Sequence, residues 1–340
     1  MKRAPLPDIH TYGIMNDNAN KQLISTNTFK QELNGQLQLM WWEVEQAGKK
    51  SSISVKTYIS LLYEGTETRL NKKMTAFDNA VYNAISTRFY YWKLEHPGEA
   101  LFISPQEVWR TMNGKDDTAR PSEKQVEKVI ESIDKMRFTR CQMDINEELK
   151  SHYITINDDR VIDGFIDTYL LETSRGKFKT EKGRIVDGYV MNIEPILYSY
   201  NKAKNHILYV DYDLLNTSDK KNTGEYTIEF TNYLLQRIQS IINGKLDSER
   251  ILFDDLYEKT GIDPPKRRLN RANYSSDDSF ASKIRGIAKQ DRETVEAIFN
   301  SWIRKGKLIK AFKPVKKSNS VVGYDLDIIN EPQKKQIAGK

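Results

Sequence analysis

One order of structural elements is predicted twice along this chain, and the repetition limits the fold more than any other feature. Each copy has a helix, a short second helix, a third helix and then β-strands joined by turns. The first copy is predicted to hold a helix of about 20 residues after Thr75, then helices Pro105–Met112 and Pro121–Met136. The second is predicted to hold helices Ile228–Ile242, Ser248–Thr260 and Arg292–Lys305, followed by a hairpin.

This order is that of the winged helix-turn-helix domain, in which the third helix enters a DNA groove and the hairpin flanks it. In the first copy, short alternating runs between residues 137 and 193 predict an antiparallel sheet larger than a usual wing. We therefore predict an α+β protein with two tandem winged helix-turn-helix domains, the first with an enlarged antiparallel β wing. The expected segments are a flexible N-terminal arm (1–50), the two domains (51–205 and 206–330) and a tail (331–340).

Local signals support the helix boundaries. Thr75 is an expected N-cap, and Phe77, Val81, Ile85 and Phe89 follow at near-helical spacing as a core stripe. The run Ser104-Pro105-Gln106-Glu107 favours a helix start, because serine can cap while glutamate reaches back to the cap.

The charge of the chain is uneven. The net charge is +6, and between Pro264 and Lys317 there are 15 Lys/Arg against 5 Asp/Glu, so +6 minus +10 leaves −4 elsewhere. Such a basic region is typical of polyanion binding. No apolar run reaches the length of a membrane helix, and the single cysteine, Cys141, fits a reducing cytoplasm. We expect a cytoplasmic protein with no membrane partner.

Motifs for catalysis are missing from the sequence. There is no G-x-x-x-x-G-K-[ST] loop for nucleotide binding, and the four histidines show no metal-ligand spacing. Asp158-Asp159 follows Asn157 in a context more typical of a hairpin turn than of a metal site. We therefore expect no enzyme activity, no metal and no cofactor, and a DNA-processing enzyme is the weakest interpretation.

Candidate DNA contacts in the first domain lie around the start of its third helix. Arginine and glutamine can make bidentate contacts to guanine and adenine, whereas serine and lysine suit phosphates. The alternative is an ordinary solvated helix face. The predicted contact residues are Lys115, Arg120, Ser122, Lys124, Gln125 and Lys128.

In the second domain, the cations flank the third helix. A basic loop precedes it and a hairpin with lysines follows it, so each can lie on a phosphate strand. A loop that only increases solubility is the alternative for the first group. The predicted contact residues are Lys266, Arg267, Arg268, Arg271, Arg292, Lys313, Lys316 and Lys317.

Two segments resemble the replication initiators of iteron-type plasmids and related mobile elements. Residues 70–78 (LNKKMTAFD) resemble the entry to the first helix of that family, and residues 231–238 (TNYLLQRI) resemble the helix that opens its second domain. The resemblance covers roughly residues 55–328, and its motifs are mostly structural. The strands at 137–193 and the basic loop at 264–290 depart from the family pattern.

The resemblance implies a sequence-specific protein that binds repeated origin sites in double-stranded DNA with both domains. It also implies opening of an A·T-rich segment and recruitment of host replication proteins, without enzyme activity. The alternative is a transcriptional autorepressor with the same DNA-binding folds. The sequence leaves open the target repeat, the host factor and the oligomeric state, including a homodimer.

Overall fold

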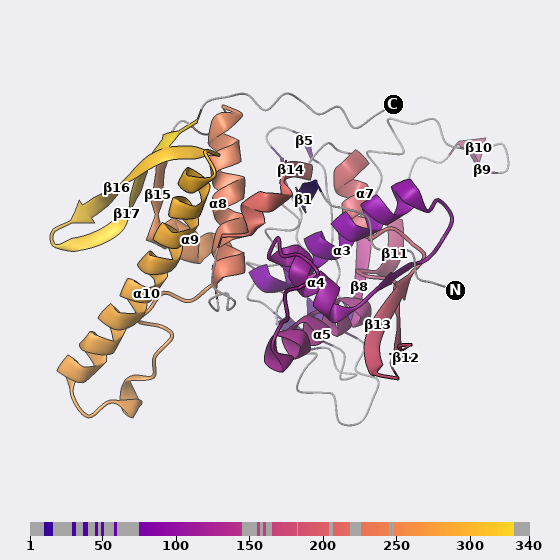
Figure 1. The fold of residues 1–340 in the computed structure, drawn as a ribbon, viewed down its shortest axis with the longest axis horizontal. Helices are drawn as coiled ribbons and strands as arrows, with labels where there is room; N and C mark the ends of the chain where they lie inside the picture. Colours follow the sequence, from indigo (N-terminus) through magenta and orange to yellow (C-terminus); the bar gives the residue numbers. More distant parts are fainter. Residues whose placement is uncertain are drawn as a thin grey trace. The chain divides into compact units, whose positions relative to one another are not determined.

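The structure is a computed structural model that describes residues 10–15, 75–144, 165–181, 183–203, 207–217, 226–244, 246 and 248–329, together with short strand segments between 29 and 59 and between 155 and 160. The chain divides into two compact units (Figure 1). The first contains residues 1–112 and 116–209, and the second contains residues 113–115 and 210–340. The predicted tail, 331–340, lies outside the described residues.

The first unit is a mixture of helices and small antiparallel sheets. Its helices are α3 (Ala76–Glu95), α4 (Pro105–Met112), α5 (Glu123–Phe138) and α7 (Ile196–Ala203). Its longer strands are β1 (Thr11–Met15), β7 (Leu101–Ile103), β8 (Thr139–Asp144), β11 (Phe165–Tyr169), β12 (Ser174–Lys179) and β13 (Ile185–Met191). Its short strands are β2 (Phe29–Gln31), β3 (Leu37–Leu39), β4 (Glu45–Gln46), β5 (Lys49–Lys50), β6 (Tyr58–Ile59), β9 (Thr155–Ile156) and β10 (Asp159–Arg160). The strand β14 (Ile207–Asp211) pairs with β1 and runs into the second unit.

Helix α3 forms the centre of the first unit. The predicted Thr75 cap is confirmed, because its hydroxyl accepts from the Asp78 amide in a capping box. The whole predicted apolar stripe, from Phe77 to Phe89, is buried. Strand β1 also packs on this helix, with the Tyr12 hydroxyl donating to the Ala80 carbonyl at 3.0 Å. For Thr11–Met15 the predicted flexible arm is therefore wrong, because four of these five residues are buried.

The strands after α5 belong to two different sheets. The hairpin β12–β13 pairs with β7 in a three-stranded sheet of order β12-β13-β7. Strands β8 and β11 instead pair with each other in a five-stranded sheet of order β11-β8-β6-β3-β2. The single enlarged wing predicted over 137–193 is therefore wrong: a compact hairpin follows a separate inserted pair of strands. Alternating residues reveal strands but do not reveal which strands pair.

The second unit has the same order of elements without the insertion. It contains a 3₁₀ turn, η1 (Tyr212–Leu215), and the helices α8 (Thr227–Ile242), α9 (Phe253–Thr260) and α10 (Asp277–Arg304), with a second 3₁₀ turn, η2 (Arg271–Asn273), before α10. The strands β15 (Arg250–Leu252), β16 (Ile309–Lys317) and β17 (Ser320–Ile328) form a sheet of order β15-β17-β16. The predicted helix start at Ser248 is wrong, because residues 250–252 pair with β17 before α9 begins.

Aromatic rings hold α10 on this sheet. Phe299 of α10 contacts Phe312 and Tyr324 with ring centroids 5.2 and 5.7 Å apart. Gly323 permits the close approach of β15 to β17, since a Cβ there would lie 2.2 Å from the Ile251 carbonyl oxygen. In both units, a strand that lies between the first two helices in sequence pairs with the hairpin that follows the third helix. This mixed α/β arrangement is compatible with winged-helix-like domains.

Of the helices in the described ranges, none combines the length and the apolar character that crossing a bilayer requires.

Candidate nucleic-acid interface

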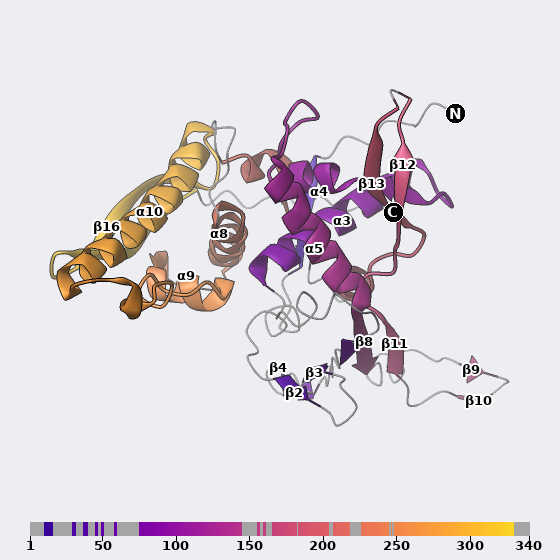
Figure 2. The same cartoon turned by 90° about the horizontal axis from the view of Figure 1, so that it is seen from below.

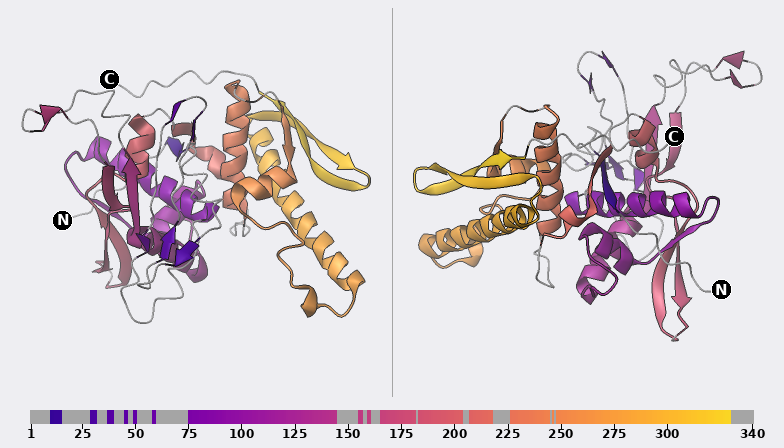
Figure 3. Two further views of the ribbon diagram at one scale, coloured as in Figure 1. Left: turned by 180° about the vertical axis from the view of Figure 1, so that it is seen from behind. Right: turned by 45° about the horizontal axis from the view of Figure 1, so that its top comes forward.

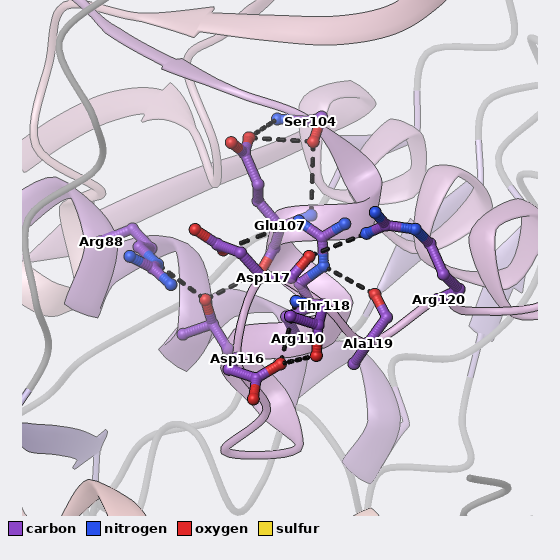
Figure 4. A network of polar contacts seen from close by, with 10 residues as sticks. Arg88, Ser104, Glu107, Arg110, Asp116, Asp117, Thr118, Ala119 and Arg120 are labelled. Carbon is purple, nitrogen blue, oxygen red and sulfur yellow. Dashed lines mark hydrogen bonds and ion pairs between the residues drawn. The ribbon is translucent and has the colours of Figure 1, made fainter.

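A polar network fixes the turn between α4 and α5, as Figure 4 shows. Arg110 of α4 donates from Nε to the Ala119 carbonyl at 3.0 Å and lies 3.8 Å from the Asp117 carboxylate. The exposed Arg120 donates from Nη1 to the Asp117 carbonyl at 2.7 Å. The predicted DNA contact Arg120 is thus at the surface, with part of its guanidinium already bonded to the turn.

The predicted start of α4 is confirmed by the same network. The Glu107 carboxylate accepts from the Ser104 amide at 2.6 Å and from its hydroxyl at 2.9 Å. At the other end of α4, the Thr111 hydroxyl accepts from Arg88 Nε at 2.8 Å. These bonds orient α4, and therefore the turn that leads to α5.

Ser122 and Gln125 form the N-terminal cap of α5. The Ser122 hydroxyl accepts from the Gln125 amide at 3.4 Å, and the Gln125 side-chain oxygen accepts from the Ser122 amide at 2.8 Å. A bidentate contact to adenine needs both the oxygen and the nitrogen of a glutamine side chain. Because the cap uses the oxygen, Gln125 is better placed to stabilise α5 than to read a base.

We expect Gln125→Ala to lower the free energy of unfolding by about 1 kcal/mol, because the α5 cap loses its return bond. Gln125→Glu keeps an acceptor at the same position and should retain the stability of the natural protein. Urea denaturation followed by circular dichroism measures both variants. Equal destabilisation by alanine and glutamate would contradict a capping role.

The solvent-facing side of α5 carries more acids than bases. Its exposed positions hold the predicted contacts Lys124 and Lys128 among the carboxylates Glu123, Glu127 and Glu131. The Lys128 ammonium lies 4.2 Å from the centre of the Phe77 ring. Carboxylates along this face would repel phosphates, so the first unit is a weaker electrostatic site than the sequence predicts.

Two lysines near α5 have structural partners. Lys135 is buried and donates to the Asp78 carboxylate at 2.5 Å. The predicted contact Lys115 donates to the Asn216 side-chain oxygen within the second unit. Its neighbour Gly114 has a positive φ of 58°, and a Cβ there would lie 2.7 Å from the Asn216 amide nitrogen. Both lysines therefore serve packing in the structure.

One interaction in the second unit bears on two predictions, the start of the third helix and the DNA contact at Arg268. Asp291, which directly precedes the predicted helix Arg292–Lys305, lies buried in the middle of α10, which begins at Asp277 after the Ser276 cap. The guanidinium of Arg268, a predicted DNA contact, bonds both Asp291 carboxylate oxygens at 3.0 and 2.9 Å. The Tyr257 hydroxyl donates to the same carboxylate at 2.8 Å. Arg268 is thus a largely buried anchor of the basic loop.

The surroundings of this ion pair are aromatic. The Arg268 guanidinium lies 4.6 Å from the centre of the Tyr226 ring and 5.4 Å from that of Tyr257. Burial, and then the hydrogen bond to Asp291, raise the pKa of the Tyr257 hydroxyl far above its usual value. The tyrosine therefore stays neutral where its hydroxyl meets the ion pair.

The other cations of the loop differ in their partners and exposure. Arg271 bonds the Asp277 carboxylate at 2.9 and 2.7 Å, which fastens the loop to the first turn of α10. Lys266 and Arg267 are exposed. Lys266 and Arg267 therefore suit phosphate contacts in the manner that the sequence predicts.

The N-terminal half of α10 extends beyond the core of its unit (Figures 1 and 3). None of the residues 277–290 is buried, over a length of about 21 Å, or about four turns, at the usual helical rise. This half carries Lys283 and Arg285, both exposed, which the site prediction omits. The predicted contact Arg292 is half-buried farther along the same helix, not at its start. The turns of α10 that precede the predicted helix start at Arg292 therefore present cations to solvent.

The hairpin that follows α10 adds a basic edge, and Figure 2 shows β16 beside α10. The predicted contacts Lys313, Lys316 and Lys317 are exposed on β16, as is Lys310, which the prediction omits. Opposite Lys313 lies Asp325, whose carboxylate bonds Arg250 of β15 at 2.7 Å. The bond to Arg250 lowers the pKa of Asp325.

Within the described ranges, no group of three or more His, Cys, Asp or Glu side chains is arranged to hold a metal ion.

Comparisons with known proteins add one likeness. No protein-family model matches the sequence, and no curated protein matches it. The structure resembles a crystal structure of domains 2 and 3 of RctB with a TM-score of 0.40 and 13% sequence identity, over 91% of this chain and 96% of that chain. A likeness at this level decides neither the fold nor the function.

Proposed function

We propose that this protein binds double-stranded DNA through two winged-helix domains and initiates replication of a plasmid or mobile element. The observation that carries the proposal is the exposed basic surface of the second unit. None of its cations is ion-paired within the part of the chain that the structure describes. This basic surface consists of Lys266, Arg267, Lys283, Arg285, Lys310, Lys313, Lys316 and Lys317.

The elements that carry this surface suit duplex DNA. The major groove is wide enough for one helix, and the exposed half of α10 extends far enough to enter it without a clash from its own core. The loop before α10 and the strand after it then lie on either side, where phosphates run. Cations on a loop, a helix and a hairpin of one compact unit match a groove with its two flanking strands.

The first unit is proposed as the second contact of an extended site. Its helix order and its β12-β13-β7 sheet match those of the second unit, whereas its α5 face is acidic. Such a unit lengthens the DNA site and fixes the orientation of the protein on it, but contributes less electrostatic affinity than the second unit. Two unequal domains on one duplex span about two helical turns.

The resemblance to iteron-type initiators favours replication over regulation alone. On this proposal the protein is cytoplasmic, acts at repeated origin sites and recruits host replication proteins, and a homodimer is one form it takes. The alternative, an autorepressor, predicts DNA binding without support of replication. A plasmid that carries the gene and its flanking repeats, with no other origin, distinguishes them: replication in the host supports an initiator, and failure with retained repression supports the autorepressor.

We also propose that the protein strains DNA without breaking it. Purified protein with Mg²⁺ and supercoiled DNA that carries the repeats is expected to make A·T-rich bases reactive to permanganate, while all the DNA stays supercoiled. Agarose gels and primer extension measure the two effects. Nicking that one Tyr→Phe substitution abolishes would instead identify a relaxase-like enzyme.

A further inference from the structure

The β12–β13 hairpin of the first unit presents an apolar side chain at its tip, among several cations and the carboxylate of Glu181. Ile185 is 70% exposed, which makes it the most exposed large apolar side chain among the described residues. It pairs across the hairpin with Lys179, so the two side chains share one face. Lys177 and Arg184 are also exposed.

The base of this hairpin is held rigidly. Arg175 bonds the carboxylates of Asp134 on α5, at 2.5 Å, and Asp187 on β13, at 3.0 Å. The Tyr189 hydroxyl donates to the same Asp134 at 3.2 Å. On the opposite face, the Phe178 ring packs edge-on against Phe102 at 4.1 Å. The hairpin therefore keeps its direction relative to α5.

Glycines make this packing possible. A Cβ on Gly176 would lie 2.7 Å from the Phe178 ring, and one on Gly188 would lie 2.9 Å from it. The ring thus covers both glycines of one cross-strand pair. At the tip, Thr180 and Arg184 close the turn with a 2.8 Å bond from the Thr180 amide to the Arg184 carbonyl.

The tip extends past this support. From Tyr189, the last residue that bonds α5, to Ile185 the strand advances about 13 Å at the usual rise per residue. Figures 2 and 3 show the hairpin projecting from its unit. Because Ile185 lies on the face that bears Tyr189, the tip displays its apolar side chain on the same side as α5.

We propose that this tip enters the DNA minor groove and inserts Ile185 as a wedge between base pairs, with Lys177, Lys179 and Arg184 on the flanking phosphates. The inference rests on the proposed function, because it assumes that duplex DNA is bound. An apolar wedge that partly unstacks one base step bends the duplex, and isoleucine is among the side chains that do so. One apolar side chain between cations suits a polyanion with a stacked interior better than a protein surface, which would need a wider apolar patch.

The test compares Ile185→Ser with Ile185→Met in the full chain. The probe is an A·T-rich duplex with 2-aminopurine in place of single adenines, moved one position at a time. The natural protein is expected to raise the fluorescence at one step. Serine should return that signal to the level of free duplex, while methionine retains most of it. Ile193→Ser, at a residue 56% exposed outside the hairpin, is the matched control and should change nothing.

Three outcomes decide the inference. Loss of the signal with Ile185→Ser, but not with Ile185→Met or Ile193→Ser, supports the wedge. An unchanged signal with Ile185→Ser, or no step that brightens while the duplex is bound, overturns the wedge but leaves the proposed function intact. Failure of the natural protein to bind any duplex overturns both, and a gel-shift assay with the same DNA separates this case.

Discussion

Asp291→Asn is expected to lower the free energy of unfolding by about 3–5 kcal/mol, because it leaves the buried Arg268 guanidinium without its counter-charge. Both side chains are nearly inaccessible, with 12% exposure for Arg268 and 5% for Asp291. The same substitution weakens the hydrogen bond of Tyr257. Urea denaturation followed by circular dichroism measures the effect, with tryptophan fluorescence as a second probe of unfolding.

Two variants show whether the cause is the buried charge. Glu293→Gln removes a carboxylate from the same helix, whose partner Lys289 is exposed at a distance of 3.7 Å. That change should cost no more than about 0.5 kcal/mol. The double variant Arg268→Met with Asp291→Leu should recover much of the stability, since a buried ion pair can be replaced by apolar side chains. Equal effects of the Asp291 and Glu293 substitutions would contradict a role for the buried charge.

Alanine at Lys313, Lys316 and Lys317 is expected to weaken binding to all DNA sequences alike. Each lysine that binds a phosphate releases counterions, so the slope of log affinity against log salt should fall by about 0.9 for each phosphate that is no longer neutralised. Fluorescence anisotropy at several salt concentrations, on specific and random duplexes, measures the slope for the single, double and triple variants.

Lys202→Ala provides the control for charge alone. Lys202 lies on α7 of the first unit and is 3.6 Å from the Glu194 carboxylate. Its removal should leave the slope unchanged. A triple variant with an unchanged slope, or one that loses affinity only for the specific sequence, would show that β16 does not anchor the phosphate backbone.

Local signals in the sequence predict much of this fold. Thr75 and the Ser104–Glu107 cap act within a few residues, and the structure has helix starts at both. The order of elements in each unit follows from the same signals. Interactions between residues near in sequence are therefore the part that pattern analysis predicts well.

Long-range pairing accounts for the errors. An aspartate directly before a predicted helix, such as Asp291 before Arg292–Lys305, is typical of a helix cap. In the structure Asp291 instead bonds Arg268, which lies 23 residues away in sequence. The spacing of Phe280, Ile284, Ile287 and Val295 continues one helical stripe through Asp291, and this signal indicates the longer α10. The ion-pair partner of a charged residue cannot be found from such spacing. Which cations are paired and which are exposed is therefore known only from the structure.

Footprinting of the intact protein on its cognate repeat tests the central claim most directly. If both units contact one continuous site, hydroxyl-radical cleavage should be suppressed over about two helical turns, roughly 20 base pairs. The triple lysine variant should lose protection at the end bound by the second unit first. Protection of about one turn by the intact protein would contradict the claim that both units bind DNA, and no protection on any repeat would contradict DNA binding itself.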